Sequence, residues 1–127
     1  MMNDEELKHK VHFIVSNILK DKIYISPVDL LMRIGVLSAK DYEDWRFGRV
    51  PYLEKVCKTN LSKLSFIMKE LRAYALGNHL NPSGTAYYRW GVKGKRIPLR
   101  FSKSGDSVIE KVYTTHYVIN TKKVEKG

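Results

Sequence analysis

Residues 81–101 read NPSGTAYYRWGVKGKRIPLRF, and within this stretch the spacing of the apolar residues changes from helical to alternating. Asn81-Pro82-Ser83-Gly84 is a cluster of residues typical of turns. From Thr85 onward apolar and polar residues alternate, and the alternation resumes after Lys93-Gly94. Two alternating runs around an X-Gly pair predict a β-hairpin over residues 85–101. Pro98 has no N–H to give to a ladder, so the second strand is expected to lie at an edge.

Upstream of this stretch the apolar residues recur at helical spacing, which predicts an N-terminal bundle of about five helices. Two long helices are expected. The first covers residues 4–20, and the second is capped by Thr59 or Asn60 and ends at Gly77. Three shorter helices are expected over 26–34 and 38–48 and after Pro51, because capping residues and helix-ending glycines mark their boundaries.

Downstream of the hairpin, Ser107 and Glu110 indicate a short helix, and residues 112–119 are rich in Val, Tyr and Thr, which predicts a third strand. The expected fold class is therefore α+β, with a helical bundle followed by a basic β-hairpin and a third strand. A chain of 127 residues has the usual size of one domain. We expect this domain to cover residues 1–120 and a frayed, charged tail to cover 121–127.

The order of helices followed by a basic hairpin resembles a winged helix-turn-helix in outline, over residues 26–101. The resemblance is topological and rests on no diagnostic motif, so it carries no function by itself. The helix in the recognition position carries Asp41, Glu43 and Asp44, which would repel a phosphate backbone. We therefore expect that helix to be a packing element.

The basic residues are concentrated in the second part of the chain. The net charge is +10 at pH 7, and residues 78–127 hold ten basic and three acidic side chains. No carboxylate lies between Glu70 and Asp106. A region that carries only positive charge attracts polyanions, although an excess of lysines also keeps small proteins soluble. The charge pattern thus favours a nucleic-acid partner without requiring one.

The composition of the chain argues against several other classes of protein. The one cysteine, Cys57, cannot form an internal disulfide or a multi-cysteine metal site, which favours the cytoplasm. No run approaches the roughly 18 apolar residues of a membrane span, so no membrane partner is expected. The four histidines share no metal-ligand spacing, and no phosphate-cradling glycine loop is present. We expect no cofactor and no metal, and the oligomeric state stays open.

Alternation sorts the side chains of the predicted hairpin onto two faces. Trp90, Leu99 and Phe101 belong to the apolar set and are expected to be buried. The opposite face gathers cations that bind phosphate oxygens, with an aromatic ring that could stack on a base. The predicted function is therefore a binding module for DNA or RNA, and not an enzyme; an ordinary solvated edge is the alternative interpretation. The expected contact residues are Tyr87, Arg89, Lys93, Lys95, Arg96, Arg100 and Lys103.

Two other functions remain open at this stage. Residues 44–52, DWRFGRVPY, combine aromatic residues and arginines, which are enriched at protein–protein hot spots, so this loop could anchor a regulated protein partner. A structured corner pinned to the core is the other interpretation of the same loop. The residues proposed to contact a protein are Trp45, Arg46, Arg49 and Tyr52. A weaker alternative is a metal-independent phosphodiesterase that uses His79 or His116 together with a cation.

Overall fold

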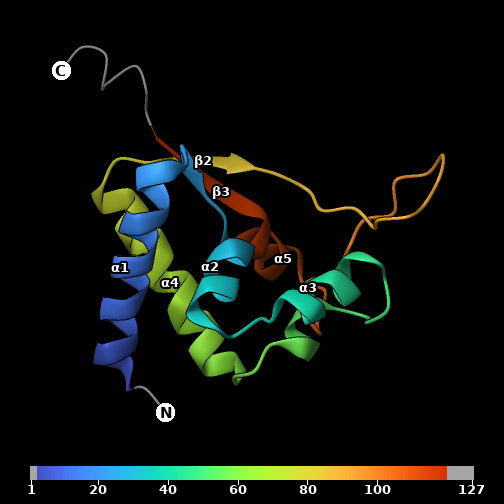
Figure 1. Ribbon diagram of the computed structural model, residues 1–127, viewed down its shortest axis with the longest axis horizontal. Coiled ribbons are helices and arrows are strands. Elements are labelled where there is room, and N and C mark those ends of the chain that lie inside the picture. The colour runs from blue at the N-terminus through green and yellow to red at the C-terminus, as the bar shows by residue number, and fades with distance from the viewer. Residues whose placement is uncertain (1–2, 120–127) are drawn as a thin grey trace.

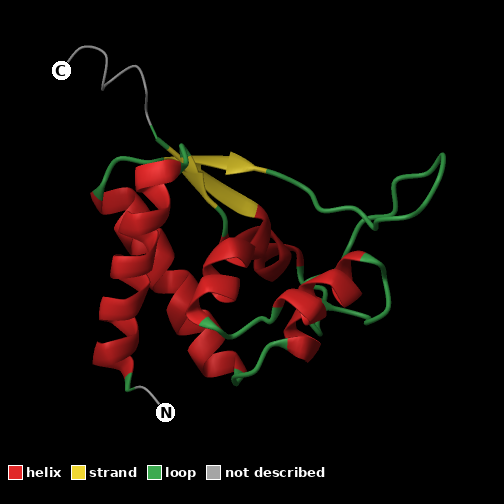
Figure 2. Ribbon diagram, viewed as in Figure 1, coloured by secondary structure: helices red, strands yellow, loops and turns green. Residues whose placement is uncertain are grey.

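The computed structural model describes residues 3–119, and the predicted tail, 121–127, lies outside the described residues. Within this part of the chain the fold is α+β, with five α-helices and a three-stranded antiparallel sheet (Figures 1 and 2). The predicted fold class is confirmed at this level. The winged-helix outline is not, because the sheet is built from segments other than the predicted hairpin.

The two long helices form one side of the molecule. Helices α1 (Asp4–Asp21) and α4 (Leu61–Gly77) pack side by side (Figure 1). Each begins at an asparagine, because the side chains of Asn3 and Asn60 accept the backbone N–H three residues further on. Each also buries an apolar stripe at helical spacing, such as Leu7, Val11 and Val15 on α1. Both helices were predicted and are confirmed.

Two of the three short helices begin at the caps that the sequence predicts, and the third segment differs. Helix α2 (Pro27–Ile34) starts at Ser26 and ends at Gly35, whose φ of 94° is the left-handed conformation that glycine adopts without strain. Helix α3 (Ala39–Arg46) starts at Ser38. The segment expected to begin at Pro51 is the 3₁₀ turn η1 (Leu53–Val56), which is tighter than an α-helix and begins two residues later.

The sheet joins three short strands that lie far apart in the sequence. Its order is β1 (Tyr24–Ile25), β3 (Thr115–Val118), β2 (Asn81–Gly84), and β3 pairs antiparallel with both neighbours. The prediction of a turn at residues 81–84 is wrong, because this segment pairs along its whole length with β3. Proline is tolerated at position 82 because β2 is an edge strand of the sheet.

The last helix is longer than predicted, and the third strand is correspondingly shorter. Helix α5 (Ser107–Thr114) extends through Val112, so β3 begins only at Thr115. Its cap is Asp106, whose carboxylate accepts the N–H groups of Val108 and Ile109, instead of the predicted Ser107. The fifth α-helix therefore follows the predicted hairpin and is not part of an N-terminal bundle.

Residues 85–101, hereafter the arm, do not form the predicted β-hairpin. They fold back on themselves with a single bridge between Tyr88 and Pro98. Only two backbone hydrogen bonds join its two limbs, residues 85–92 and 95–101. They run from Arg89 N to Ile97 O at 2.8 Å and from Leu99 N to Tyr87 O at 2.9 Å. A two-stranded ribbon without a third strand or a packing surface is marginal in water, which explains why the alternating pattern yields no ladder here.

The C-terminal end of the arm is anchored in an aromatic core. Trp45 is fully buried, and its indole Nε1 donates a hydrogen bond of 2.8 Å to the carbonyl of Arg100. Its ring lies 4.9 Å, centroid to centroid, from that of buried Phe101. The carboxylate of Glu110 accepts the N–H groups of Phe101 at 2.9 Å and of Ser102 at 2.7 Å. The arm therefore leaves the body from a firmly held point.

The lone cysteine should be unreactive. Cys57 is partly buried at the end of η1, and desolvation raises the pKa of its thiol to about 12. Because only the thiolate is nucleophilic, we expect alkylation by iodoacetamide at pH 8 to be at least about tenfold slower in the folded protein than in the denatured chain. Mass spectrometry over time measures both rates. Equal rates would mean that the thiol is accessible and has an ordinary pKa.

Candidate functional site

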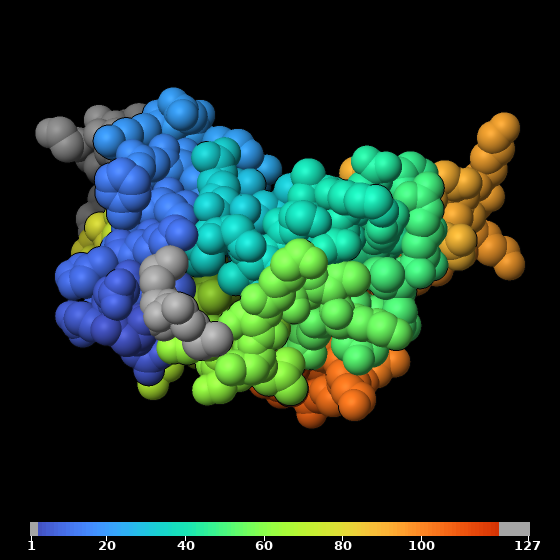
Figure 3. Space-filling model, turned by 60° about the horizontal axis from the view of Figure 1, so that its bottom comes forward, coloured from blue at the N-terminus to red at the C-terminus, as the bar shows by residue number. Residues whose placement is uncertain are grey.

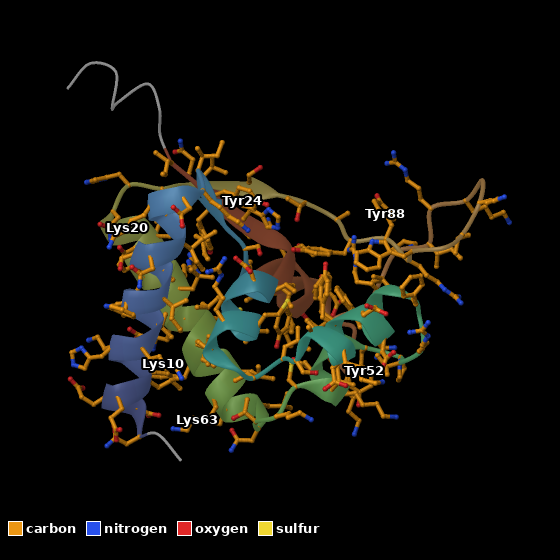
Figure 4. The ribbon with its side chains drawn as sticks, in the orientation of Figure 1. Lys10, Lys20, Tyr24, Tyr52, Lys63 and Tyr88 are labelled. Atoms are coloured by element: carbon orange, nitrogen blue, oxygen red, sulfur yellow. The ribbon has the colours of Figure 1, made fainter. Side chains whose placement is uncertain are left out.

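The arm projects from the body of the molecule. It extends beyond α3 at the right of Figure 1, and in Figure 3 its end stands clear of the surrounding surface. Figure 4 shows Tyr88 on the arm, well separated from Lys20 on α1. Glycines form the far end, where Gly91 and Gly94 adopt φ values of 78° and 80°. Around this turn Lys93 and Lys95, on either side of Gly94, are exposed, while Val92 is partly buried.

Four of the predicted contact residues lie between positions 89 and 96 of the arm and define what we call the arm tip. All four are exposed, and among the described residues none has a carboxylate oxygen within 4.0 Å of its charged group. They are Arg89, Lys93, Lys95 and Arg96. The Arg96 guanidinium lies 5.3 Å from the ring centroid of Tyr88, and Arg89 Nε donates to the carbonyl of Phe47. These contacts hold the two arginines but leave their charge uncompensated.

Arg100 and Lys103 do not join the arm tip. The guanidinium of Arg100 donates to the carbonyls of Ser102 and Lys103 and lies 5.8 Å from the ring centroid of Tyr52, so it fastens the loop after the arm. Lys103 lines a separate groove beside α4 and α5. Four of the predicted cations thus share the projecting arm, whereas Arg100 fastens the following loop and Lys103 lines another surface.

The base of the arm rests on Arg46 of α3. The Arg46 guanidinium carbon lies 4.6 Å from the ring centroid of Trp90, 5.1 Å from that of Tyr87 and 5.9 Å from that of Tyr42. The backbone carbonyl of Arg46 accepts the N–H of Trp90 at 2.7 Å. Its Nε is buried and has no hydrogen-bond partner among the described residues. The arm and the 44–52 loop, predicted as rival sites, are therefore parts of one structure.

The first limb of the arm, residues 85–92, does not keep the predicted alternation, although Arg89 is exposed as predicted. Trp90 is 39% exposed, whereas Tyr87 is partly buried against the core, and burial raises the pKa of its phenol to about 12. On the second limb, residues 95–101, Phe101 is buried and Arg96 and Arg100 are exposed as predicted, but Ile97 is 38% exposed and Leu99, expected to be buried, is only partly so. The prediction of a buried Trp90 is wrong because the limbs do not lie in one pleated sheet, so alternation is not maintained around the turn.

A cavity of about 370 Å³ lies between the base of the arm and the sheet. Aromatic rings form much of its wall, and Tyr24 stacks on His116 at 5.3 Å with only 11° between the planes. Lys22 and Arg46 bring positive charge, which Asp29 partly offsets through its 3.7 Å contact with Lys22. The arrangement can stack a planar ring and hold an anionic group.

His116 forms part of the wall of this cavity. Desolvation lowers its pKa below the ordinary value of 6.5. Its Nε2 lies 3.2 Å from the hydroxyl of Tyr87, which ties β3 to the base of the arm. The other histidine of the phosphodiesterase hypothesis, His79, is exposed just after α4.

The 44–52 loop is a tightly bonded corner. Arg49 pairs with Asp44 at 2.9 Å, and the hydrogen bonds from Arg49 and Lys40 lower the pKa of the Asp44 carboxyl. Trp45 lies wholly in the core, and Tyr52 is partly buried. Two of the residues proposed to meet a protein partner are thus engaged inside the molecule.

Within residues 3–119 no group of three or more His, Cys, Asp or Glu side chains is placed to hold a metal ion. Nor does that part of the chain contain a helix with the length and apolar character to cross a membrane. No known protein family matches the sequence, and no curated protein or solved structure was found to be similar to it. Functional inference therefore depends on the geometry of the arm tip and of the cavity at its base.

Proposed function

We propose that the protein is a nucleic-acid-binding module that contacts phosphates through the arm tip and is not an enzyme. The observation that carries the proposal is the projecting arm with four exposed cations and no carboxylate partner among the described residues. Guanidinium groups bind phosphate oxygens in pairs of hydrogen bonds, and lysines add charge without strict geometry. An arm this narrow suits a groove or a single strand of DNA or RNA.

The cavity at the base of the arm supports the same function. A strand that follows the arm toward the body would reach the exposed Trp90 and then the cavity walls formed by Tyr24 and His116. Aromatic rings accept any base by stacking, and Arg46 and Lys22 would attract the accompanying phosphate. This arrangement favours contacts along a backbone over recognition of a particular sequence.

A salt titration tests the proposal. Each neutralised phosphate of duplex DNA contributes about −0.9 to the slope of log K against log salt, so four contacts predict a slope of roughly −3.6. Fluorescence anisotropy with a labelled mixed-sequence duplex measures this slope. For the matching single strand, each neutralised phosphate is expected to contribute about −0.7 to the slope. Affinity that does not change with salt, or no binding at low salt, would contradict the proposal.

A further inference from the structure

A second surface of the molecule shares no residue with the arm tip. A groove of about 1,090 Å³ lies between α4 and α5 and ends at β2 and β3. Buried side chains form its floor, among them Met68, Leu71 and Tyr113. The groove is therefore part of the folded body and does not depend on the position of the arm.

The walls of the groove expose large apolar side chains. Val108, the most exposed of them at 71%, lies on α5. Five of the ten large hydrophobic side chains that are exposed in residues 3–119 line this one groove. They are Leu61, Leu76, Val108, Ile109 and Val112. Single exposed apolar residues are ordinary, but a contiguous apolar groove marks a site for a partner.

The rim of the groove is basic on both sides. Lys69 and Arg72 come from α4, while Lys103 and Lys111 come from the opposite wall. Among the described residues, none of these four has a carboxylate within 4.0 Å. The one carboxylate in the lining, Glu54, is already occupied by hydrogen bonds from the Tyr113 hydroxyl and the Lys103 N–H. An occupant with negative charge along both of its edges would fit this rim.

The length of the groove indicates the form of the occupant. Leu61 and Leu76 line it from opposite ends of α4, fifteen residues apart, which corresponds to about 22 Å of helix at 1.5 Å per residue. An antiparallel or parallel helix of about four turns would span this distance and present an apolar stripe between two acidic edges. A fatty acid carries a single carboxylate and would leave most of the basic rim without a partner.

Segments of this chain are poorer candidates. Residues 120–127 contain three lysines and one glutamate, so they have the same sign of charge as the rim. The acidic helix α3 buries its large apolar residue, Trp45, in the core and offers no apolar stripe. We therefore propose that the α4–α5 groove binds an acidic amphipathic helix of a partner protein, independently of the nucleic-acid function of the arm.

Binding of a designed helix tests this proposal. The probe is a labelled 18-residue peptide with leucines at helical spacing flanked on both sides by glutamates, and its control carries lysines in place of the glutamates. We expect saturable binding of the acidic peptide at micromolar concentration by fluorescence anisotropy, and at least tenfold weaker binding of the basic one. Absence of binding, or equal binding of the two peptides, would overturn the proposal.

Variants of the protein locate the binding surface. Val112→Glu and the double variant Lys69→Glu/Lys111→Glu should each weaken binding of the acidic peptide at least tenfold, and both alter exposed side chains. Phe13→Glu is the matched control, because Phe13 is 68% exposed on α1 and outside the groove. Circular dichroism checks that all variants are folded. Equal loss in the Phe13→Glu variant would show that the effect does not come from the groove.

Other occupants would give different results in the same set of experiments. Displacement of the peptide by micromolar palmitate would identify a lipid site, and a dimer that Val112→Glu converts to a monomer in sedimentation would identify a second copy as the occupant. A loss of DNA affinity in Lys69→Glu/Lys111→Glu as large as that caused by changes at the arm tip would make the groove part of the nucleic-acid surface. Each of these three results would overturn the partner-helix proposal, and the first two would leave the arm proposal untouched.

Discussion

Reversing the charge of the arm tip should weaken nucleic-acid binding at least about a hundredfold at physiological salt. In the triple variant Lys93→Glu/Lys95→Glu/Arg96→Glu, three phosphate contacts are lost, and at about 0.15 M salt the release of counterions contributes roughly fivefold in affinity per contact. The introduced carboxylates would also repel the phosphates. The slope of log K against log salt should fall toward zero in the same titration. All three side chains are exposed, so folding should be unaffected.

A matched charge reversal elsewhere distinguishes the arm tip from a general effect of net charge. Lys8, Lys20 and Lys55 are exposed lysines outside the arm, and among the described residues none pairs with a carboxylate. Reversing these three changes the net charge by the same amount and should reduce affinity only by a small factor. Similar losses in the two triple variants would mean that the protein binds nucleic acid through its overall charge.

Trp45→Ala should lower the free energy of unfolding by about 3–5 kcal/mol, because it opens a large cavity in the core. The fully buried indole contacts Phe101, and its loss also removes one of the two hydrogen bonds that the carbonyl of Arg100 accepts, the other coming from the Leu53 N–H. Since small domains are stable by only about 5–15 kcal/mol, the midpoint of urea unfolding should fall sharply.

Trp90→Ala removes the same side chain from a partly exposed position and serves as the control. Trp90 is 39% exposed and rests mainly on Arg46, Tyr42 and Phe47, so its loss should cost clearly less stability than the loss of Trp45. The sequence alone predicts a large cost for Trp90, and the structure reverses that expectation. A greater destabilisation by Trp90→Ala than by Trp45→Ala would contradict the placement of the two rings.

The helices could be predicted because their boundaries are set by local chemistry. Ser26 accepts the N–H of Asp29 at 3.1 Å and Asn60 accepts that of Lys63 at 2.8 Å, as the capping patterns predict. The stripes of apolar residues on α1 and α4 are also local, since side chains three and four positions apart share a face. Such features are present in the sequence whatever the rest of the chain does.

The strands could not be predicted in the same way, because pairing depends on distant segments. Residues 81–84 have the composition of a turn, yet they form β2 because β3 lies beside them. Conversely, the arm has the alternation of a hairpin but lacks a neighbouring strand, so only the Tyr88–Pro98 bridge forms. Propensity for β-structure depends on such tertiary context more than propensity for helix does.

The positive charge of the candidate site could be predicted from the sequence, but the contacts that hold the arm against α3 could not. The cations of the arm tip follow from composition and from the position of the glycines. The stacking of Arg46 on Trp90 depends on the arm folding back over α3, which no local pattern encodes. Tyr42 and Arg46 are four residues apart on α3, and this spacing, like the clustering of arginines and aromatic residues in 44–52, indicates an arginine beside an aromatic ring.

The position of β3 in the sheet has a consequence for biosynthesis. The middle strand of the sheet is the last of the three to be translated, because β1 ends at Ile25 and β2 at Gly84, whereas β3 covers Thr115–Val118. Until residue 118 has left the ribosome, the two outer strands have no partner with which to pair, while α1, α2 and α4 can already form. The nascent chain therefore passes through a helical stage with two unpaired strand segments, the kind of species that chaperones protect from aggregation.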